Sequence, residues 1–225
     1  MTGCVLVVAK APVAGQAKTR LGRAVGDRAA ARVAAAALLD TLDAVLATPD
    51  VVPVVALTGR LESAELLDEL AALLARCIVI PQRGGDLGER LANAHLDVAA
   101  RFPGMPVFQL GMDTPQVRPA TLAGAFAALG VAPNGAVLGP AADGGWWGLG
   151  LRSPAGATVL RAVPMSRGDT GMWTLLALRG AGLRVRRLPA MSDVDTLPDA
   201  LRVARLVPGS RFAAAVAELG LVTAR

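Results

Sequence analysis

The sequence is poor in the residues that most often build metal and nucleophile sites. Its 225 residues include one histidine and two cysteines. Zinc sites take several Cys or His ligands, so we do not expect a zinc centre. A Ser-His-Asp triad would depend on His95, and no Gly-x-Ser-x-Gly motif accompanies it, so we expect His95 to be a packing residue. Cys4 and Cys77 fall in apolar, strand-like segments, which predicts reduced, buried thiols in a cytoplasmic protein.

Aromatic residues and long apolar runs are scarce as well. Aromatic side chains make up 3% of the chain, and tyrosine is absent. The net charge is +5, but the arginines are scattered, so neither a base-stacking surface nor a basic block indicates a nucleic-acid partner. No apolar run reaches the roughly 18–20 residues of a transmembrane helix, and no signal-peptide pattern opens the chain. We expect a cytoplasmic protein with no integral membrane segment.

Apolar strand-like segments alternate with amphipathic helical segments. The expected strands are 5–9, 51–57, 77–80, 107–110, 136–138, 147–151 and 183–188. The expected helices are 27–46, 62–74, 86–102, 119–129, 169–179, 197–206 and 210–219. This alternation predicts an α/β protein with a mostly parallel central sheet covered on both faces by helices. With 53% hydrophobic residues and no low-complexity linker, residues 1–225 are expected to form one domain, as a monomer or a homodimer.

The loop after the first strand carries an unusual concentration of cations. Ligands of such sheets bind beyond the carboxyl ends of the strands. A Pro/Gly loop at that position contains Lys10, Lys18 and Arg20 within eleven residues, and a helix-forming stretch follows. Loop amides with paired cations are typical of a phosphate site. The loop matches neither the P-loop nor the Gly-x-Gly-x-x-Gly spacing, and solvated surface cations are the alternative.

Two acidic positions predict a divalent-cation site. Asp113 directly follows a strand, and Asp195 lies with Asp193 at spacing i, i+2 ahead of a helix. Hard cations need clustered oxygen ligands, so we expect Asp113 and Asp195 to hold Mg²⁺ or Mn²⁺ on a diphosphate, with Asp193 as the second candidate. Turn and cap roles are the alternatives, since Thr196 and Asp199 form a capping-box pattern.

The segment Asp143-Gly144-Gly145-Trp146 predicts a contact with an acceptor hydroxyl. Asp-Gly-Gly forms a tight turn that lets a ligand approach the backbone closely, and a tryptophan can stack on the apolar face of a sugar. Adjacent tryptophans in a strand point to opposite faces, so at most one of Trp146 and Trp147 lines a pocket. An ordinary hairpin turn is the alternative.

Two further loops carry weaker candidates. Gln82 follows a short strand, and its amide can hydrogen-bond a nucleobase edge. The alternative is a plain loop that leads to a helix cap at Asp86. Ser166 precedes an expected helix, where a cap role competes with acceptor binding.

Five motifs occur in a fixed order along the chain. They are Ala9-Lys10-x-Pro12-x-x-Gly15-x-x-Lys18-Thr19-Arg20-Leu21, Gln82-x-x-Gly85-Asp86-Leu87-Gly88-Glu89-Arg90, Gly111-x-Asp113-Thr114-Pro115, Gly139-Pro140-x-x-Asp143-Gly144-Gly145 and Asp193-Val194-Asp195-Thr196. Over residues 4–202 the chain resembles bacterial GT-A-type glycosyltransferases of the nucleotide-diphospho-sugar transferase superfamily. It is also similar to phospholactate guanylyltransferase and, more distantly, to the guanylyltransferase of molybdenum cofactor synthesis.

The resemblance implies a GT-A Rossmann-like fold, a three-layer α/β/α sandwich, with one divalent metal ion, Mg²⁺ or Mn²⁺. It implies metal ligation by Asp113 and Asp195. The implied nucleotide-binding residues are Ala9, Lys10, Gly15, Lys18, Arg20, Gln82, Gly88 and Asp113, with Gln82 and Gly88 near the base. The expected acceptor-binding residues are Asp143, Gly144, Gly145, Trp146 and Ser166. The expected catalytic residues are Lys18, Arg20, Asp113 and Asp143.

Three functions follow as hypotheses. The first is a glycosyltransferase that moves a sugar from a nucleotide sugar to a small-molecule acceptor. The second is a nucleotidyltransferase, guanylyltransferase-like, that forms an activated sugar or phospho-acid and releases pyrophosphate. The third is a non-catalytic nucleotide-binding protein. In the first two, Lys18 and Arg20 stabilise a departing phosphate. Met165 and Trp146-Trp147-Gly148 depart from the usual pattern on the acceptor side, so the acceptor stays open.

Overall fold

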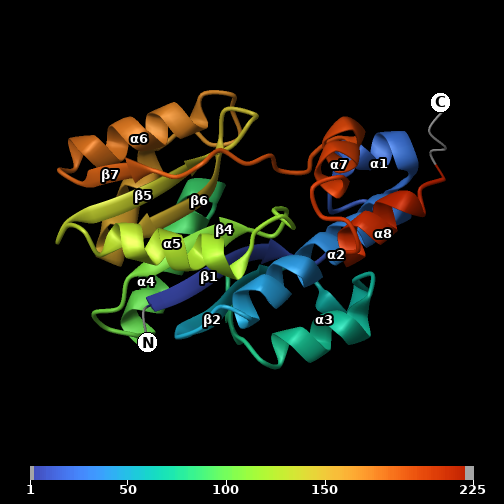
Figure 1. Ribbon diagram of the computed structural model, residues 1–225, viewed down its shortest axis with the longest axis horizontal. Helices are drawn as coiled ribbons and strands as arrows, with labels where there is room; N and C mark the ends of the chain where they lie inside the picture. Colours follow the sequence, from blue (N-terminus) through green and yellow to red (C-terminus); the bar gives the residue numbers. More distant parts are fainter. Residues whose placement is uncertain (1–2, 221–225) are drawn as a thin grey trace.

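A seven-stranded sheet forms the centre of the protein, whose residues 3–220 are described by a computed structural model (Figure 1). The strands are β1 (Gly3–Lys10), β2 (Val51–Thr58), β3 (Ile78–Pro81), β4 (Val107–Gly111), β5 (Gly135–Pro140), β6 (Trp146–Leu151) and β7 (Arg184–Arg187). Their order is β3-β2-β1-β4-β6-β5-β7. Strand β6 runs antiparallel to β4 and β5, and the other pairs are parallel. The expected mostly parallel sheet is therefore confirmed.

Helices cover both faces of this sheet and make three layers. They are α1 (Thr19–Val25), α2 (Asp27–Leu46), α3 (Leu67–Leu74), α4 (Leu87–Arg101), α5 (Pro119–Leu129), α6 (Thr170–Gly180), α7 (Leu197–Ala204) and α8 (Arg211–Ala217), with 3₁₀ segments η1 (Leu61–Ser63) and η2 (Pro154–Ala162). Alternate residues of β1 divide between the faces: Val5 and Val7 pack with α2 and α5, and Cys4 and Leu6 pack with α4. This period of two is what a strand buried on both faces requires.

The helices α1, α7 and α8 lie together at one end of α2, beyond the edge of the sheet layers (Figure 1). Their apolar side chains form a cluster around Leu21, Val203 and Phe212. The segment that leads into α7 thereby returns from the last strand to the neighbourhood of α1. This return brings residues near position 195 back to the loop that follows β1.

The structure corrects the expected helix 62–74. The chain instead forms η1 and, after a break, α3, and Leu66 at the break has a left-handed backbone with φ 55°. The backbone N–H of Glu65 donates to the carbonyl of Pro12, at 3.0 Å, so the break ties this segment to the loop after β1. The segment η2 was not predicted. In contrast, α2 and α5 have the expected bounds.

The two cysteines are free thiols within the described residues, Cys4 buried and Cys77 half-buried. Burial raises the pKa of each thiol to about 11. Because the thiolate is the reactive form, both cysteines are chemically quiet near neutral pH. Between residues 3 and 220, no helix is both long and apolar enough to cross a bilayer.

Close packing at the centre of the sheet predicts the effect of one added methyl group. A Cβ at Gly148 of β6 would lie 2.6 Å from Cζ of Phe108. We expect Gly148→Ala to lower the free energy of unfolding by about 1–3 kcal/mol through overpacking. The matched control is Gly124→Ala in α5, where a Cβ meets no atom within 4 Å; it should raise stability by about 0.5–1 kcal/mol. Urea unfolding measures both, and equal effects would contradict the packing described.

Candidate functional site

Two neighbouring pockets open at the edge of the sheet where β1, β4 and β5 end and β6 begins. The larger, of about 570 Å³, we call the main pocket, and the smaller, of about 280 Å³, the loop pocket. The loop pocket lies against the loop after β1 and is lined by Lys10, Gln16 and Lys18, among others. Four residues line both pockets and are shared between them: Arg20, Met112, Asp113 and Asp195. These shared residues form the junction between the pockets.

At the junction, two remote carboxylates converge on one cation. Nζ of Lys18 lies 2.6 Å from Oδ2 of Asp113 and 2.8 Å from Oδ1 of Asp195. Arg20 Nη1 lies 3.5 Å from the second oxygen of Asp195. The side chains come from the start of α1, the turn after β4 and the segment before α7. The carboxylates selected as metal ligands therefore do meet, and the cation between them is the Lys18 ammonium.

The charges at the junction perturb one another. Burial lowers the pKa of Lys18, but Asp113 and Asp195 raise it by more, so the net direction is upward and the ammonium stays charged. Asp193 has negative rather than positive charges around it. Burial, followed by the charges of Asp143, Asp113 and Asp195, raises its pKa to about 6. This end of the main pocket therefore holds an excess of negative charge, and we call it the acidic end.

Two residues of the site have strained backbones. Lys18 has φ 50° and Ser166 has φ 59°, both in the left-handed region that side-chain-bearing residues rarely adopt. Lys18 lines the loop pocket and Ser166 lines the main pocket. Strain of this kind persists where the surroundings fix the conformation, and it is enriched at functional sites.

The junction has the donors for a magnesium ion that also binds phosphate. Within residues 3–220, no three His, Cys, Asp or Glu side chains are arranged to hold a metal ion by themselves. Mg²⁺ usually takes one or two carboxylates and completes its shell with substrate phosphates and water. Asp113 and Asp195 supply such a pair. Space is kept for Asp113 by Gly111, since a Cβ there would lie 2.7 Å from Oδ1 of Asp113.

Asp143 closes a local turn, and its side chain also borders the main pocket. Oδ1 of Asp143 accepts a hydrogen bond from the backbone N–H of Gly145, at 2.8 Å, which closes a local turn. Gly144 has φ 89°, and a Cβ on it would lie 1.8 Å from the carbonyl oxygen of Gly168, so only glycine fits. Asp143 and Gly145 nevertheless line the main pocket, and Gly144 supports the turn from behind.

The adjacent tryptophans divide as strand geometry requires. Trp146 lines the main pocket, and its Nε1–H donates to the hydroxyl of Thr174 at 3.1 Å. Trp147 is buried on the other face of the sheet, where it packs against Phe108 and donates to the carbonyl of Pro189. Of these two tryptophans, only Trp146 can therefore contact a ligand in the main pocket.

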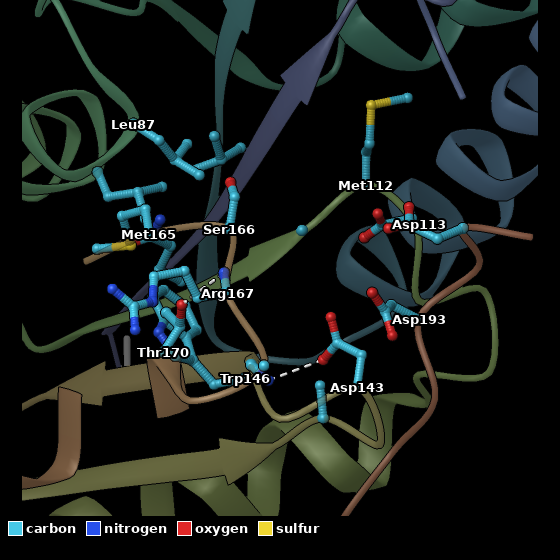
Figure 2. A pocket seen from close by; sticks show the side chains of 18 of the residues that line it. Leu87, Met112, Asp113, Asp143, Trp146, Met165, Ser166, Arg167, Thr170 and Asp193 are labelled. Carbon is cyan, nitrogen blue, oxygen red and sulfur yellow. Dashed lines mark hydrogen bonds between the residues drawn. The ribbon is translucent and has the colours of Figure 1, made fainter. Parts of the chain in front are cut away.

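The main pocket has a second end with different chemistry. Figure 2 shows Leu87, Met165 and Ser166 on one side of the pocket, across from Asp113 and Asp193 on the other. We call this second side the α4 end, because Leu87 and Leu91 of α4 line it. Sequence reasoning missed the contributions of Leu87, Leu91, Gln109 and Arg167 to the pocket lining, whereas it had placed Met165 on the acceptor side.

The expected base-binding residues have structural roles. The amide nitrogen of Gln82 donates to the carbonyls of Ala9 and Ala56, each at 2.8 Å, and so joins β3 to the ends of β1 and β2. A Cβ on Gly88 would lie 2.5 Å from the carbonyl oxygen of Leu160, so this glycine permits close packing of α4 on η2. In the described part of the chain, neither Gln82 nor Gly88 lines the two pockets.

The remaining predicted nucleotide contacts lie in or beside the loop pocket. Lys10 lines it, and the Lys10 backbone N–H contacts the sulfur of Met112 at 3.3 Å. Ala9 is buried, and its carbonyl is held by Gln82. Gly15 has φ 73° and forms the tight part of the loop. Lys10, Lys18, Arg20 and Asp113 thus line the loop pocket, whereas Gln82 binds the neighbouring Ala9 carbonyl and lines neither pocket.

The middle of the chain matches a known protein family. A family of uncharacterized proteins conserved in bacteria (DUF2064) matches residues 41–167, which is more than half of the chain. The chain belongs to the DUF2064 family. The matched span contains Asp113 and Asp143 of the site, while Lys18 and Asp195 lie outside it. A search of curated proteins gave no match for this DUF2064 protein.

Solved structures resemble the DUF2064 protein over nearly its whole length. A protein from Desulfovibrio desulfuricans assigned as a nucleotide-diphospho-sugar transferase is 28% identical, with a TM-score of 0.83, covering 96% of this chain and 94% of that one. A 4-diphosphocytidyl-2C-methyl-D-erythritol synthase is 12% identical, with a TM-score of 0.57 and coverage of 92% and 99%. A CMP:2-keto-3-deoxy-manno-octonic acid synthetase complexed with CTP is 14% identical, with a TM-score of 0.53 and coverage of 90% and 96%. The last two show the fold alone, and together the three confirm the Rossmann-like fold of nucleotide-diphospho-sugar transferases.

A buried polar pair lies beside the pocket, between α4 and β4. His95 is 0% exposed, and neither ring nitrogen has a hydrogen-bond partner among the described residues. Burial lowers the pKa of His95 to about 4, and contact with Gln109 opposes part of this shift. His95 is therefore neutral and internal, in keeping with the packing role expected of it.

The burial of His95 predicts a pH-dependent loss of stability. The unfolded chain binds a proton at His95 near pH 6.5 and the folded chain near 4, so stability falls as pH falls between these values. We expect His95→Leu to remove about 2–3 kcal/mol of the decrease in unfolding free energy between pH 7 and about 4.5. Urea unfolding at both pH values measures it, and comparison with the unsubstituted protein cancels the opposite contribution of Asp193. An unchanged pH dependence would contradict the buried, neutral His95.

Proposed function

We propose that this DUF2064 protein is a metal-dependent transferase of the GT-A type that uses a nucleotide-activated donor, and that it acts as a glycosyltransferase on a nucleotide sugar. The observation that carries the proposal is the convergence of Lys18, Asp113 and Asp195 where the two pockets meet. Its likeness to a structure assigned as a nucleotide-diphospho-sugar transferase supports the same class. We place the reaction in the cytoplasm.

The two pockets divide the substrate between them. The loop pocket suits the phosphates of a nucleotide because three cations, Lys10, Lys18 and Arg20, line it. The main pocket begins at the same junction and suits the sugar and the acceptor. Transfer breaks the bond between the last phosphate and the sugar, and that bond then lies at the junction. Lys18 and Arg20 are in position to stabilise the negative charge that develops on the departing phosphate.

Asp113 and Asp195 are the residues that would hold Mg²⁺ or Mn²⁺ there. The ion would supply positive charge to the departing phosphate. Both carboxylates now face Lys18, so a cation at this position competes with the ammonium for the same oxygens. A phosphate that accepts a hydrogen bond from Lys18 draws the ammonium away from the carboxylates and so relieves this competition. Nucleotide binding is therefore expected to strengthen metal binding, and metal binding to strengthen nucleotide binding.

Asp143 is proposed as the residue that holds the acceptor hydroxyl. One of its oxygens is engaged by the Gly145 N–H, and the side chain lines the main pocket. A carboxylate that accepts a hydrogen bond from the hydroxyl orients its oxygen and can take its proton as transfer proceeds. Gly144, Gly145, Trp146 and Ser166 complete the proposed acceptor site.

A nucleotidyltransferase is the second candidate function. Two of the solved structures with this fold are named as a 4-diphosphocytidyl-2C-methyl-D-erythritol synthase and a synthetase complexed with CTP. Three cations beside the loop pocket also suit a triphosphate, from which pyrophosphate would leave. A guanylyltransferase-like activity belongs to this second candidate. A thermal-shift panel separates the two: nucleotide sugars stabilise a glycosyltransferase most, and nucleoside triphosphates stabilise a nucleotidyltransferase most.

The metal ligands are tested by removing one negative charge at a time. We expect Asp113→Asn and Asp195→Asn each to weaken Mg²⁺-dependent binding of nucleoside diphosphates by about 10- to 100-fold, because a ligand to the ion is lost. Calorimetry with and without Mg²⁺ isolates the metal-dependent part. Asp50→Asn is the control, an exposed residue remote from both pockets whose φ of 59° asparagine tolerates. Unchanged metal dependence in both site variants would overturn the metal assignment.

The role of Lys18 is tested by its dependence on salt. We expect Lys18→Met to weaken nucleotide binding by about 10-fold at about 0.02 M ionic strength and by less at about 0.5 M, because salt screens a contact between charges. Arg23→Met removes the same charge from α1 at a position that lines neither pocket, and serves as the control. A loss that is the same at both ionic strengths would argue against direct contact between Lys18 and phosphate.

A further inference from the structure

The α4 end of the main pocket is mainly apolar, and its polar side chains are Gln109, Ser166, Arg167 and Thr170. Val8, Trp146 and Met165 line it and pack against the same apolar cluster as Leu91. Gln109 of β4 also lines the pocket and is 1% exposed. Its side-chain oxygen has no hydrogen-bond partner among residues 3–220. A buried polar atom without a partner destabilises the free protein, and a hydrogen bond from a ligand would remove that cost.

The strand pattern explains why the amide faces this pocket. Along β4, Phe108 and Leu110 pack toward α5, and Val107 packs toward α4. Gln109 has the same parity as Val107, so its side chain faces α4. Behind it lies His95 of α4, which is also fully buried and has no hydrogen-bond partner among the described residues. The amide is thus held between a neutral imidazole and the pocket.

Charge restricts what can bind at the α4 end. Beyond the Lys18-paired Asp113, the acidic end carries Asp143 and Asp193, which disfavour an anionic group on a ligand inside the main pocket. At the α4 end, the nearby cation is Arg167, whose Nε already lies 3.0 Å from Asp169. A phosphate or carboxylate bound there would lose water without gaining a free cation. A hydroxyl group fits better, because it can donate or accept and so can pair with either atom of the Gln109 amide.

We propose that the α4 end of the main pocket binds a neutral, hydroxylated ring, and that Gln109 selects it by a hydrogen bond to one ring hydroxyl. The ring is the sugar of the substrate, so this inference rests on the proposed transferase function. It narrows the substrate class to neutral sugars and disfavours sugar acids and sugar phosphates. The ring belongs either to the nucleotide-sugar donor or to a sugar acceptor, and the experiment below distinguishes these sources.

The test compares ligands with and without the ring. We would measure binding of UDP-, GDP-, ADP- and dTDP-glucose and of the corresponding nucleoside diphosphates by calorimetry with Mg²⁺. The Gln109→Met variant keeps the side-chain length and removes the amide. If the ring is the donor sugar, Gln109→Met weakens binding of the preferred glucose nucleotide by about 3- to 10-fold and leaves the diphosphate unchanged. If it is the acceptor sugar, the same loss appears when free glucose is titrated into the protein saturated with nucleoside diphosphate and Mg²⁺.

Three controls keep the outcome decisive. Gln116→Met makes the same substitution at a residue that lines neither pocket, and should leave the ratio of glucose-nucleotide to diphosphate affinity unchanged. Gln109→Asn keeps an amide but shortens it, and should show the same loss as Gln109→Met. Unchanged diphosphate binding also shows that each variant is folded.

Two results would overturn the inference while the proposed function stands. In one, the ratio of glucose-nucleotide to diphosphate affinity, or the affinity for free glucose, is the same in the Gln109 variants as in the unsubstituted protein. The other is a glucuronic acid nucleotide that binds as tightly as its glucose counterpart. Failure of every nucleotide and of glucose to bind would instead overturn the proposed function, and this inference with it.

Discussion

The ammonium of Lys18, held between Asp113 and Asp195, connects three parts of the chain that are distant in sequence. Asp113 and Asp195 are 95 and 177 residues away from Lys18. A largely buried charge is tolerated when opposite charges surround it, and two carboxylates also need a cation between them to approach so closely. This contact fixes the loop after β1, the turn after β4 and the segment before α7 relative to one another. Those three segments form the junction at which the two pockets meet.

This contact also separates two kinds of chemistry. Cations line the loop pocket, carboxylates line the acidic end of the main pocket, and mainly apolar side chains with the buried Gln109 amide line the α4 end. A nucleotide sugar has a matching sequence of groups, from anionic phosphates to a neutral ring. The boundary between the phosphates and the ring is the bond that a transferase breaks. The position of the charged junction at that boundary is the reason that we favour transfer over simple nucleotide binding.

Much of the fold could be predicted because it depends on local patterns. Apolar periodicity and the proline at the start of α5 gave that helix its bounds, and the run 27–46 gave α2. The break at Leu66 could not be predicted from local pattern, because it occurs where Glu65 donates a hydrogen bond to the distant Pro12 carbonyl. The antiparallel placement of β6 between β4 and β5 likewise depends on pairing that no single segment encodes.

The site could be predicted in part for the same reason. Residues that directly follow parallel strands must gather at one edge of the sheet, so Asp113 and Asp143 could be selected from their positions. Lys18 was selected as a phosphate ligand, but its place between two aspartates is a tertiary contact. Gln109 was missed, although a lone glutamine in the apolar strand Val107–Gly111 was a visible sign. Gln82 was selected but lines neither pocket, because a polar side chain after a strand can also hydrogen-bond backbone carbonyls, as Gln82 does.

A crystal structure with Mn²⁺ and the nucleoside diphosphate that binds best would test the central claim most directly. Anomalous scattering locates the manganese without assumptions about the ligands. Our account requires one manganese peak bonded to the carboxylates of Asp113 and Asp195 and to phosphate, with Lys18 turned from the carboxylates toward the nucleotide. Manganese and phosphates bound elsewhere, with Lys18 still between the two aspartates, would contradict it.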